Sequence, residues 1–132
     1  MTTFVDTSAF LAVLNAEDHM HQEARGEWER LLESDTTLRT TNYVLVETSA
    51  LLQSRIGVDG LRLFAADVVP VLDIIWVDAG MHLSAYHSLL VAARRELSLV
   101  DCVSFEAMRR LGIDTVFCFD AHFAQQGFQV LA

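Results

Sequence analysis

Segments with the pattern of β-strands alternate with segments of helical pattern from one end of this chain to the other. The expected strands cover residues 3–6, 36–41, 71–77, 115–119 and 128–131. Strands separated by helices form βαβ units, which build a parallel sheet with helices on both faces. Because crossovers between parallel strands are right-handed, we expect a three-layer α/β fold whose central five-stranded sheet has the order 3-2-1-4-5.

Caps and helix breakers mark the expected helices as clearly as apolar spacing does. Asn42 is a good N-cap, Gly57 ends the helix that follows it, and Pro70 stops the next one. Ser98 is placed to cap a later helix. The predicted helices cover residues 7–15, 43–55, 59–69, 79–96, 99–111 and 120–125, and a further helix runs to about residue 34.

The length and composition are those of one compact domain. The chain has 132 residues, 52% of them hydrophobic, so we expect a single domain over residues 1–132 with a sizeable core. No apolar run reaches about 18 residues, and the N-terminus lacks the pattern of a signal peptide, which favours a cytoplasmic protein. Cys102 and Cys118 stand outside any CxxC pair, so both are predicted to be free, buried thiols.

The chain is acidic, and its cationic side chains are all Arg. The formal net charge is −9, which is unusual for a nucleic-acid-binding protein. Because the sequence contains no Lys, the P-loop class of nucleotide binding is excluded. Arg94, Arg95, Arg109 and Arg110 lie near helix C-termini, where they either compensate the helix dipole or contact RNA or a partner.

Three Asp residues stand at the starts of predicted helices. Asp6 and Asp120 also follow strands 1 and 4, which are neighbours in the expected order, so both lie where a parallel α/β sheet gathers its ligands. Asp101 follows Ser98 with the spacing of a capping box. Each Asp alone is also explained as a helix cap, so it is their joint placement that predicts a functional site.

Glu47 lies on the apolar side of its predicted helix, with Val44 and Leu51 one turn away. A buried charge there is costly unless a metal ion or an Arg from elsewhere in the chain balances it. Four carboxylates gathered in one crevice would repel one another without a cation. Oxygen ligands select Mg²⁺ or Mn²⁺ rather than zinc.

Four short motifs, in order along the whole chain, resemble the PIN-domain nucleases and in particular the VapC-type toxins of bacterial toxin–antitoxin pairs. The motifs are VDTSA at residues 5–9, TTNYVLVE at 40–47, LSLVDC at 97–102 and FCFDAHF at 117–123. By this resemblance Asp6, Glu47, Asp101 and Asp120 match the family's acidic metal-binding quartet. Ser8 matches a small hydroxyl position close to the site.

The resemblance implies a Mg²⁺- or Mn²⁺-dependent endoribonuclease with a PIN-like fold. Such a toxin would be held inactive by a small cognate antitoxin protein and would form homodimers. Asp6, Asp101 and Asp120 would hold one or two metal ions, whereas Glu47 would either bind metal or orient the attacking water.

Two positions depart from the family's pattern. Val100 stands where a Thr or Ser often precedes the acidic residue, and Cys118 stands where a Thr is frequent. Both changes remove a hydroxyl group near the site, which affects hydrogen bonding around the ligands rather than the ligands themselves.

The His and Trp residues are interpreted more simply. His19, His21 and His122 are predicted to have solvent-exposed or packing roles, because a metal centre can act without a His base. Trp28 and Trp76, like the Phe residues, are predicted to lie in the core.

Two other functions fit parts of the pattern. An acidic-site phosphatase or phosphotransfer domain would carry a second Asp two residues after the first, but Ser8 stands there, and such sites commonly also use a Lys. A PIN-like module that binds a partner without cutting RNA is the other alternative, and the four acids argue against it. Uptake of Mg²⁺ or Mn²⁺ would separate the nuclease from the binding module.

Overall fold

The computed structural model describes residues 1–131 of the chain. Its sheet contains β1 (Thr2–Val5), β2 (Thr37–Thr41), β3 (Asp73–Ile75), β4 (Thr115–Phe117) and β5 (Gln129–Leu131). All four strand pairings are parallel, and the strand order is β3-β2-β1-β4-β5. The predicted parallel sheet of order 3-2-1-4-5 is therefore confirmed.

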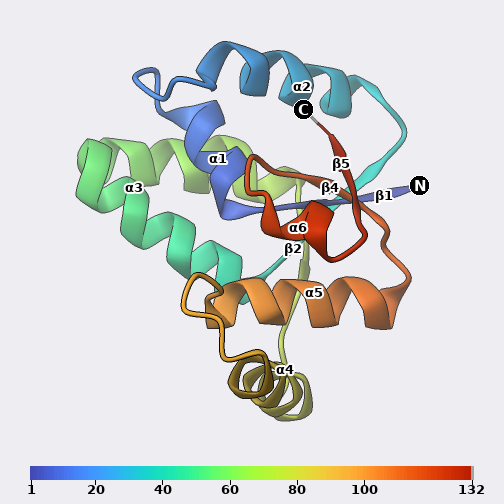
Figure 1. Ribbon diagram of the computed structural model, residues 1–132. Coiled ribbons are helices and arrows are strands. Elements are labelled where there is room, and N and C mark those ends of the chain that lie inside the picture. Colours follow the sequence, from blue (N-terminus) through green and yellow to red (C-terminus); the bar gives the residue numbers. More distant parts are fainter. Residues whose placement is uncertain (132) are drawn as a thin grey trace.

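Helices cover both faces of the sheet (Figure 1). They are α1 (Thr7–Leu14), α2 (His21–Glu33), α3 (Asn42–Leu63), α4 (Ala79–Ala92), α5 (Leu99–Leu111) and α6 (His122–Gln125), with a π-helical turn (Phe64–Val68) and a 3₁₀ turn (Val69–Val71) after α3. In Figure 1, α4 and α5 lie on one side of the sheet and α1 and α2 on the other, and α3 contacts both α1 and α5. None of the helices in residues 1–131 combines the length and hydropathy needed to cross a membrane.

The central strands are buried on both faces, as expected for a parallel sheet covered by helices. Phe4 and Val5 of β1 and Val116 and Phe117 of β4 have no exposed surface. The two cysteines, Cys102 and Cys118, are buried and free, as predicted. The buried centre of the molecule is therefore the pair β1–β4, and Asp6 and Asp120 follow the carboxyl ends of these two strands.

The break predicted at Gly57 is present. Gly57 adopts φ +80°, a left-handed conformation that favours glycine, and it interrupts the helical geometry inside α3. The N-cap predicted at Asn42 is wrong, because Thr41 caps α3 by accepting the Val44 N–H at 3.2 Å. The Asn42 side chain instead accepts the Val77 N–H at 2.8 Å, which fixes the segment after β3.

The helix predicted over residues 79–96 is too long at its C-terminal end. α4 ends at Ala92, and Ala93 adopts a left-handed conformation with φ 51°. A short turn follows, in which the Leu97 N–H bonds to the Arg94 carbonyl and the Leu97 side chain is buried. Burial of Leu97 and the N-cap of α5 at Ser98 therefore end the helix, although residues 93–96 favour helix locally.

Strands 3 and 4 are shorter than predicted. β3 contains only Asp73–Ile75, because Val71 belongs to the 3₁₀ turn at Pro70. Trp76, predicted to lie in the core, follows the edge strand β3 and is 72% exposed, so that assignment is wrong. Trp28 is buried as predicted. β4 ends at Phe117, which leaves residues 118–121 as a loop before α6.

Candidate metal centre

Asp6 lies directly after β1 and is buried. Its N–H donates to the Phe117 carbonyl at 3.1 Å, which holds it against the end of β4. Its carboxylate caps α1 by accepting the Ser8 N–H at 3.1 Å, and it also accepts the Ser8 hydroxyl at 2.7 Å. The cap that explains Asp6 locally therefore also fixes its carboxylate at the carboxyl edge of the sheet.

Asp101 is brought to the same edge by the start of α5. The capping box predicted from Ser98-x-x-Asp101 is present: the Asp101 N–H donates to the Ser98 hydroxyl at 3.0 Å. In return, the Ser98 N–H donates to the Asp101 carboxylate at 3.1 Å. The Asp101 side chain is buried and uses one oxygen, Oδ2, for this cap.

Asp120 and His122 complete a group of ligand atoms with Asp101. The Asp120 carboxylate accepts the His122 N–H at 2.7 Å. His122 Nδ1 lies 2.8 Å from Oδ1 of Asp120 and 3.9 Å from Oδ2 of Asp101. One ligand atom from each of the three residues lies within 4.8 Å of the others. Residues 19 positions apart in the chain thus converge at the end of β4.

The electrostatics link Asp6 to this group. Burial raises the pKa of Asp6 from 3.8 to about 7, against the lowering effect of the Ser8 hydrogen bonds, and the charges of Asp101 and Asp120 raise it further. Burial likewise raises the pKa of Asp101, and the charge of Asp120 adds to the effect. Neighbouring carboxylates whose charges raise the pKa values of Asp6 and Asp101 are a donor set that a hard divalent cation would stabilise.

His122 was not predicted to stand beside the carboxylates. Its Nδ1 atom is buried and has no hydrogen-bond partner among the described residues, because the short contact with Asp120 lacks hydrogen-bond geometry. The side chain is largely buried, so of the two predicted roles a solvent-exposed one does not fit. The spacing Asp120-x-His122 was the available signal, but burial of the ring beside Asp101 depends on the tertiary fold.

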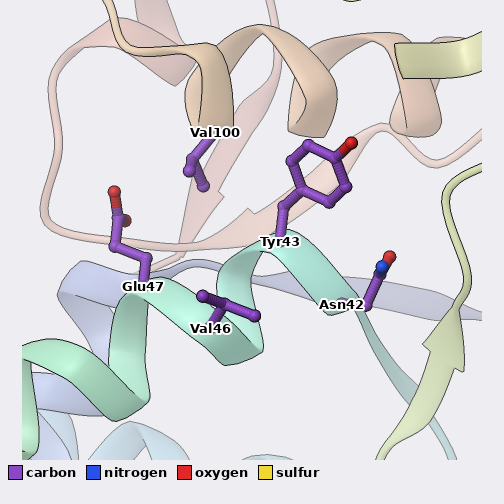
Figure 2. A pocket seen from close by; sticks show the side chains of 5 residues that line it. All are labelled: Asn42, Tyr43, Val46, Glu47 and Val100. Carbon is purple, nitrogen blue, oxygen red and sulfur yellow. The ribbon is translucent and has the colours of Figure 1, made fainter.

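Glu47 lies beside this group rather than within it. It is half-buried on α3 and lines a cavity of about 390 Å³ with Asn42, Tyr43, Val46 and Val100. Figure 2 shows Glu47 and Val100 pointing into the space between the starts of α3 and α5. No Arg of residues 1–131 forms an ion pair with Glu47, so the alternative of a structural ion pair is not realised there.

Cys118 supplies a hydrogen-bond donor where the family often has a hydroxyl. Its Sγ donates to the Asp120 carbonyl at 3.5 Å, which supports the loop that carries Asp120. Burial, and then the charge of Asp6, raises the pKa of Cys118 to about 12, so the thiol stays neutral at physiological pH. Val100 offers no comparable donor and faces the apolar cavity beside Glu47.

Comparison with known proteins relates this arrangement to one family. The PIN domain family matches residues 3–129. The chain is 36% identical over 126 residues to the 23S rRNA-specific endonuclease VapC20 of Mycobacterium tuberculosis, covering 95% of this chain and 94% of the relative. The crystal structure of VapC20, described as a toxin that cleaves the sarcin–ricin loop, superposes with a TM-score of 0.85 over 97% of this chain and 96% of the other, at 33% identity.

More distant structures share the fold. FitAcB from Neisseria gonorrhoeae has a TM-score of 0.69 at 13% identity, over 100% of this chain and 97% of the other. VapBC2 from Rickettsia felis, bound to a DNA fragment from its promoter, has the same score at 14% identity, over 99% and 98% of the two chains. The chain belongs to the PIN-domain family of nucleases, and its resemblance to VapC-type toxins is confirmed.

Proposed function

We propose that this protein is a divalent-metal-dependent endoribonuclease whose site is formed by Asp6, Asp101 and Asp120, with Glu47 at its rim. The observation that carries the proposal is the convergence of Asp101, at the start of α5, and Asp120, after β4, next to the buried Asp6, on which both charges act. Each is oriented by its own hydrogen bonds, so the three side chains are held in place before any ion binds.

The residues present fit Mg²⁺ or Mn²⁺. Asp6, Asp101 and Asp120 would hold the ion, and Glu47 would either bind it or orient water from the neighbouring cavity. A bound divalent ion supplies two effects: it favours ionised water as the nucleophile, and it offsets negative charge on the scissile phosphate. The chain's own contribution is orientation, because Ser8, Ser98 and backbone N–H groups fix the carboxylates.

The substrate class is proposed from the curated relative. VapC20 is named as a 23S rRNA-specific endonuclease, and the structural match to it covers almost the whole of both chains. We propose that ribosomal RNA, and first the sarcin–ricin loop of 23S rRNA, is the substrate of this chain as well. Cleavage of ribosomal RNA would place its action in the cytoplasm, which agrees with its two free thiols.

A protein partner and a second copy of the chain are also proposed. The resemblance to VapC-type toxins implies a small cognate antitoxin that blocks the acidic site. A homodimer is supported by α4, whose outer face exposes Leu83, Tyr86 and Leu90. These residues are spaced i, i+3 and i+7, so they form one apolar stripe that a second copy would cover.

The alternatives are less well supported by the same geometry. Ser8, which stands where a phosphotransfer domain would carry a second Asp, uses its hydroxyl to hold Asp6. A binding module without catalysis would not need three buried or half-buried carboxylates whose charges raise the pKa values of Asp6 and Asp101. Calorimetric titration with Mg²⁺ and Mn²⁺ distinguishes the nuclease from the binding module, because an absence of metal uptake would favour the binding module.

The decisive experiment is cleavage of 23S rRNA and of a labelled RNA hairpin that carries its sarcin–ricin loop. We expect cleavage with Mg²⁺ or Mn²⁺, none with EDTA, and loss of activity in Asp6→Asn with the fold retained. Asp35→Asn is the matched control, because Asp35 is exposed in the loop before β2. Full activity of Asp6→Asn would refute the assignment of the site.

A further inference from the structure

A second cavity, of about 410 Å³, adjoins the acidic group on the side of α1. Ser8 and Phe119 line it, and these residues meet directly because the Phe119 N–H donates to the Ser8 hydroxyl at 2.9 Å. The same hydroxyl holds Asp6, and Phe119 immediately precedes Asp120. The cavity therefore shares its wall with the residues that orient two of the three proposed ligands.

One cation faces this cavity. Arg55, on the exposed side of α3, lines it and has no carboxylate partner among residues 1–131. Six of the nine Arg residues do form ion pairs: Arg25, Arg30, Arg39, Arg62, Arg94 and Arg110. Arg109 bonds to the Gln126 side chain at 2.7 Å and stacks on Phe128. Arg95 likewise has no carboxylate partner within residues 1–131, but it lies in the exposed loop after α4 and lines neither this cavity nor the one beside Glu47.

The acid on the cavity wall does not neutralise Arg55. Oδ1 of Asp18 accepts the Met20 N–H at 2.8 Å and lies 3.8 Å from His19 Nδ1, and no ion pair joins Asp18 to Arg55 among residues 1–131. The guanidinium of Arg55 is therefore left to bind an anion from outside. Guanidinium groups bind phosphate through two parallel hydrogen bonds, and this is the contact that an acidic chain of net charge −9 needs in order to hold RNA locally.

The remaining walls of the cavity are mostly apolar, with His19 as the one further polar residue. Leu11 and Ala12 of α1, Met20 and the half-buried residue Phe119 form the apolar part. Aromatic side chains beside a cationic group are the usual platform for an unstacked base of single-stranded or loop RNA. The cavity therefore suits one nucleotide beside the proposed cleavage site. The aromatic ring and apolar wall would contact its base, and the guanidinium would bind its phosphate.

We propose that this cavity binds the nucleotide next to the scissile bond, with its phosphate on Arg55 and its base against Phe119. The proposal rests on the proposed ribonuclease function and adds the part of the site that selects an unpaired nucleotide. Arg55 is a substrate-binding residue here, because it contacts a phosphate that is not cleaved. Its loss should therefore weaken binding of RNA more than it slows the chemical step.

The test compares Arg55→Gln and Arg55→Lys with Arg62→Gln. Arg62 is the matched control, because it lies further along α3, is exposed and pairs with Asp59. The probe is the labelled RNA hairpin with the sarcin–ricin loop. Cleavage rates give KM and kcat, and fluorescence anisotropy in the Asp6→Asn background gives Kd over a series of KCl concentrations.

We expect Arg55→Gln to raise KM about tenfold with kcat changed by less than about twofold. The slope of log Kd against log salt should fall by about 0.7, the value for one phosphate contact on a single strand. Arg55→Lys should keep the salt slope, and Arg62→Gln should change neither quantity.

The assignment would be overturned if the wild type cuts the hairpin and Arg55→Gln has the same KM and salt slope. In that case the cavity would more simply serve a protein partner. The proposed ribonuclease function would survive that result. If the wild type neither binds nor cuts the hairpin, the proposed substrate and this subsite both fall.

Discussion

The hydroxyl of Ser8 donates a hydrogen bond of 2.7 Å to the carboxylate of Asp6. The same oxygen accepts the Phe119 N–H at 2.9 Å, so one side chain at the start of α1 joins the end of β1 to the loop after β4. A hydrogen bond to the ionised carboxylate favours the charged form, which partly offsets the effect of burial on the pKa of Asp6. Ser8 therefore both positions Asp6 and keeps it available to a cation.

Removing the hydroxyl in Ser8→Ala should weaken the metal centre and the fold together. The Phe119 N–H would lose its partner, which should lower the free energy of unfolding by about 1–3 kcal/mol. Affinity for Mn²⁺ should fall about tenfold, as is typical when a group that orients a ligand is removed. Calorimetry and urea denaturation measure the two effects, and Ser54→Ala on the exposed side of α3 is the control. Equal Mn²⁺ affinity in Ser8→Ala and wild type would contradict the role given to Ser8.

The stability of the metal-free protein should fall as pH rises through the acidic range. The pKa of Asp6 is about 7 in the folded protein, compared with 3.8 for an Asp side chain without these interactions. Between pH 3.8 and about pH 7, the folded state therefore keeps a proton that the unfolded chain has lost. The free energy of unfolding therefore decreases from about pH 4 to about pH 7 and then levels off, and Asp101 acts in the same direction.

Urea denaturation in EDTA at several pH values measures this effect. The contribution of Asp6 is on the order of a few kcal/mol over the whole range, because each unit of pKa difference is worth about 1.4 kcal/mol. Asp6→Asn should lose that part of the pH dependence, and added Mn²⁺ should stabilise wild type more at pH 8 than at pH 5. Identical pH dependence in wild type and Asp6→Asn would show that Asp6 is ionised normally.

His122 should add to the affinity of the centre for divalent metals that bind an imidazole nitrogen. Its Nδ1 atom is buried beside Asp120 and Asp101 without a hydrogen bond, and imidazole binds later transition metals such as Co²⁺ far better than Mg²⁺. His122→Gln should therefore lower Co²⁺ affinity about tenfold and change Mg²⁺ affinity much less. Calorimetric titration with each ion measures the ratio, and exposed His87→Gln on α4 is the control. If both ions lose affinity equally, His122 acts on the carboxylates rather than as a donor.

The fold was largely predictable because its signals are local and are repeated along the chain. Strand and helix patterns alternate, and the handedness of the crossovers then leaves few strand orders. The errors occur where a distant residue decides the outcome. Asn42 belongs to a residue type that often caps helices, but its side-chain oxygen accepts the N–H of Val77, which is 35 residues away in the sequence. Trp76 is apolar enough for a core, but it stands at the edge of the sheet.

In the candidate site, too, the local features were predictable from the sequence and the features that depend on tertiary packing were not. For Asp6 and Asp101, the sequence offers a helix cap and a metal site as alternative roles, but in the structure the cap itself orients the carboxylate. His122 and Arg55 could not be assigned from the sequence, because one depends on burial next to Asp101 and the other on the lack of a carboxylate partner. Both properties arise only when separate segments pack together.

The apolar stripe on α4 leads to the last prediction. Leu83 and Leu90 are 65% and 66% exposed and lie on one face with Tyr86, which is unfavourable for a free surface. If a second copy covers this face, the wild type should have twice the chain mass of 14.8 kDa in light scattering, and the double variant Leu83→Glu, Leu90→Glu should have the mass of one chain. Leu32→Glu, at an exposed Leu on α2, is the matched control and should remain dimeric. A monomeric wild type, or a double variant that stays dimeric with unchanged helix content, would show that the second copy binds elsewhere or not at all.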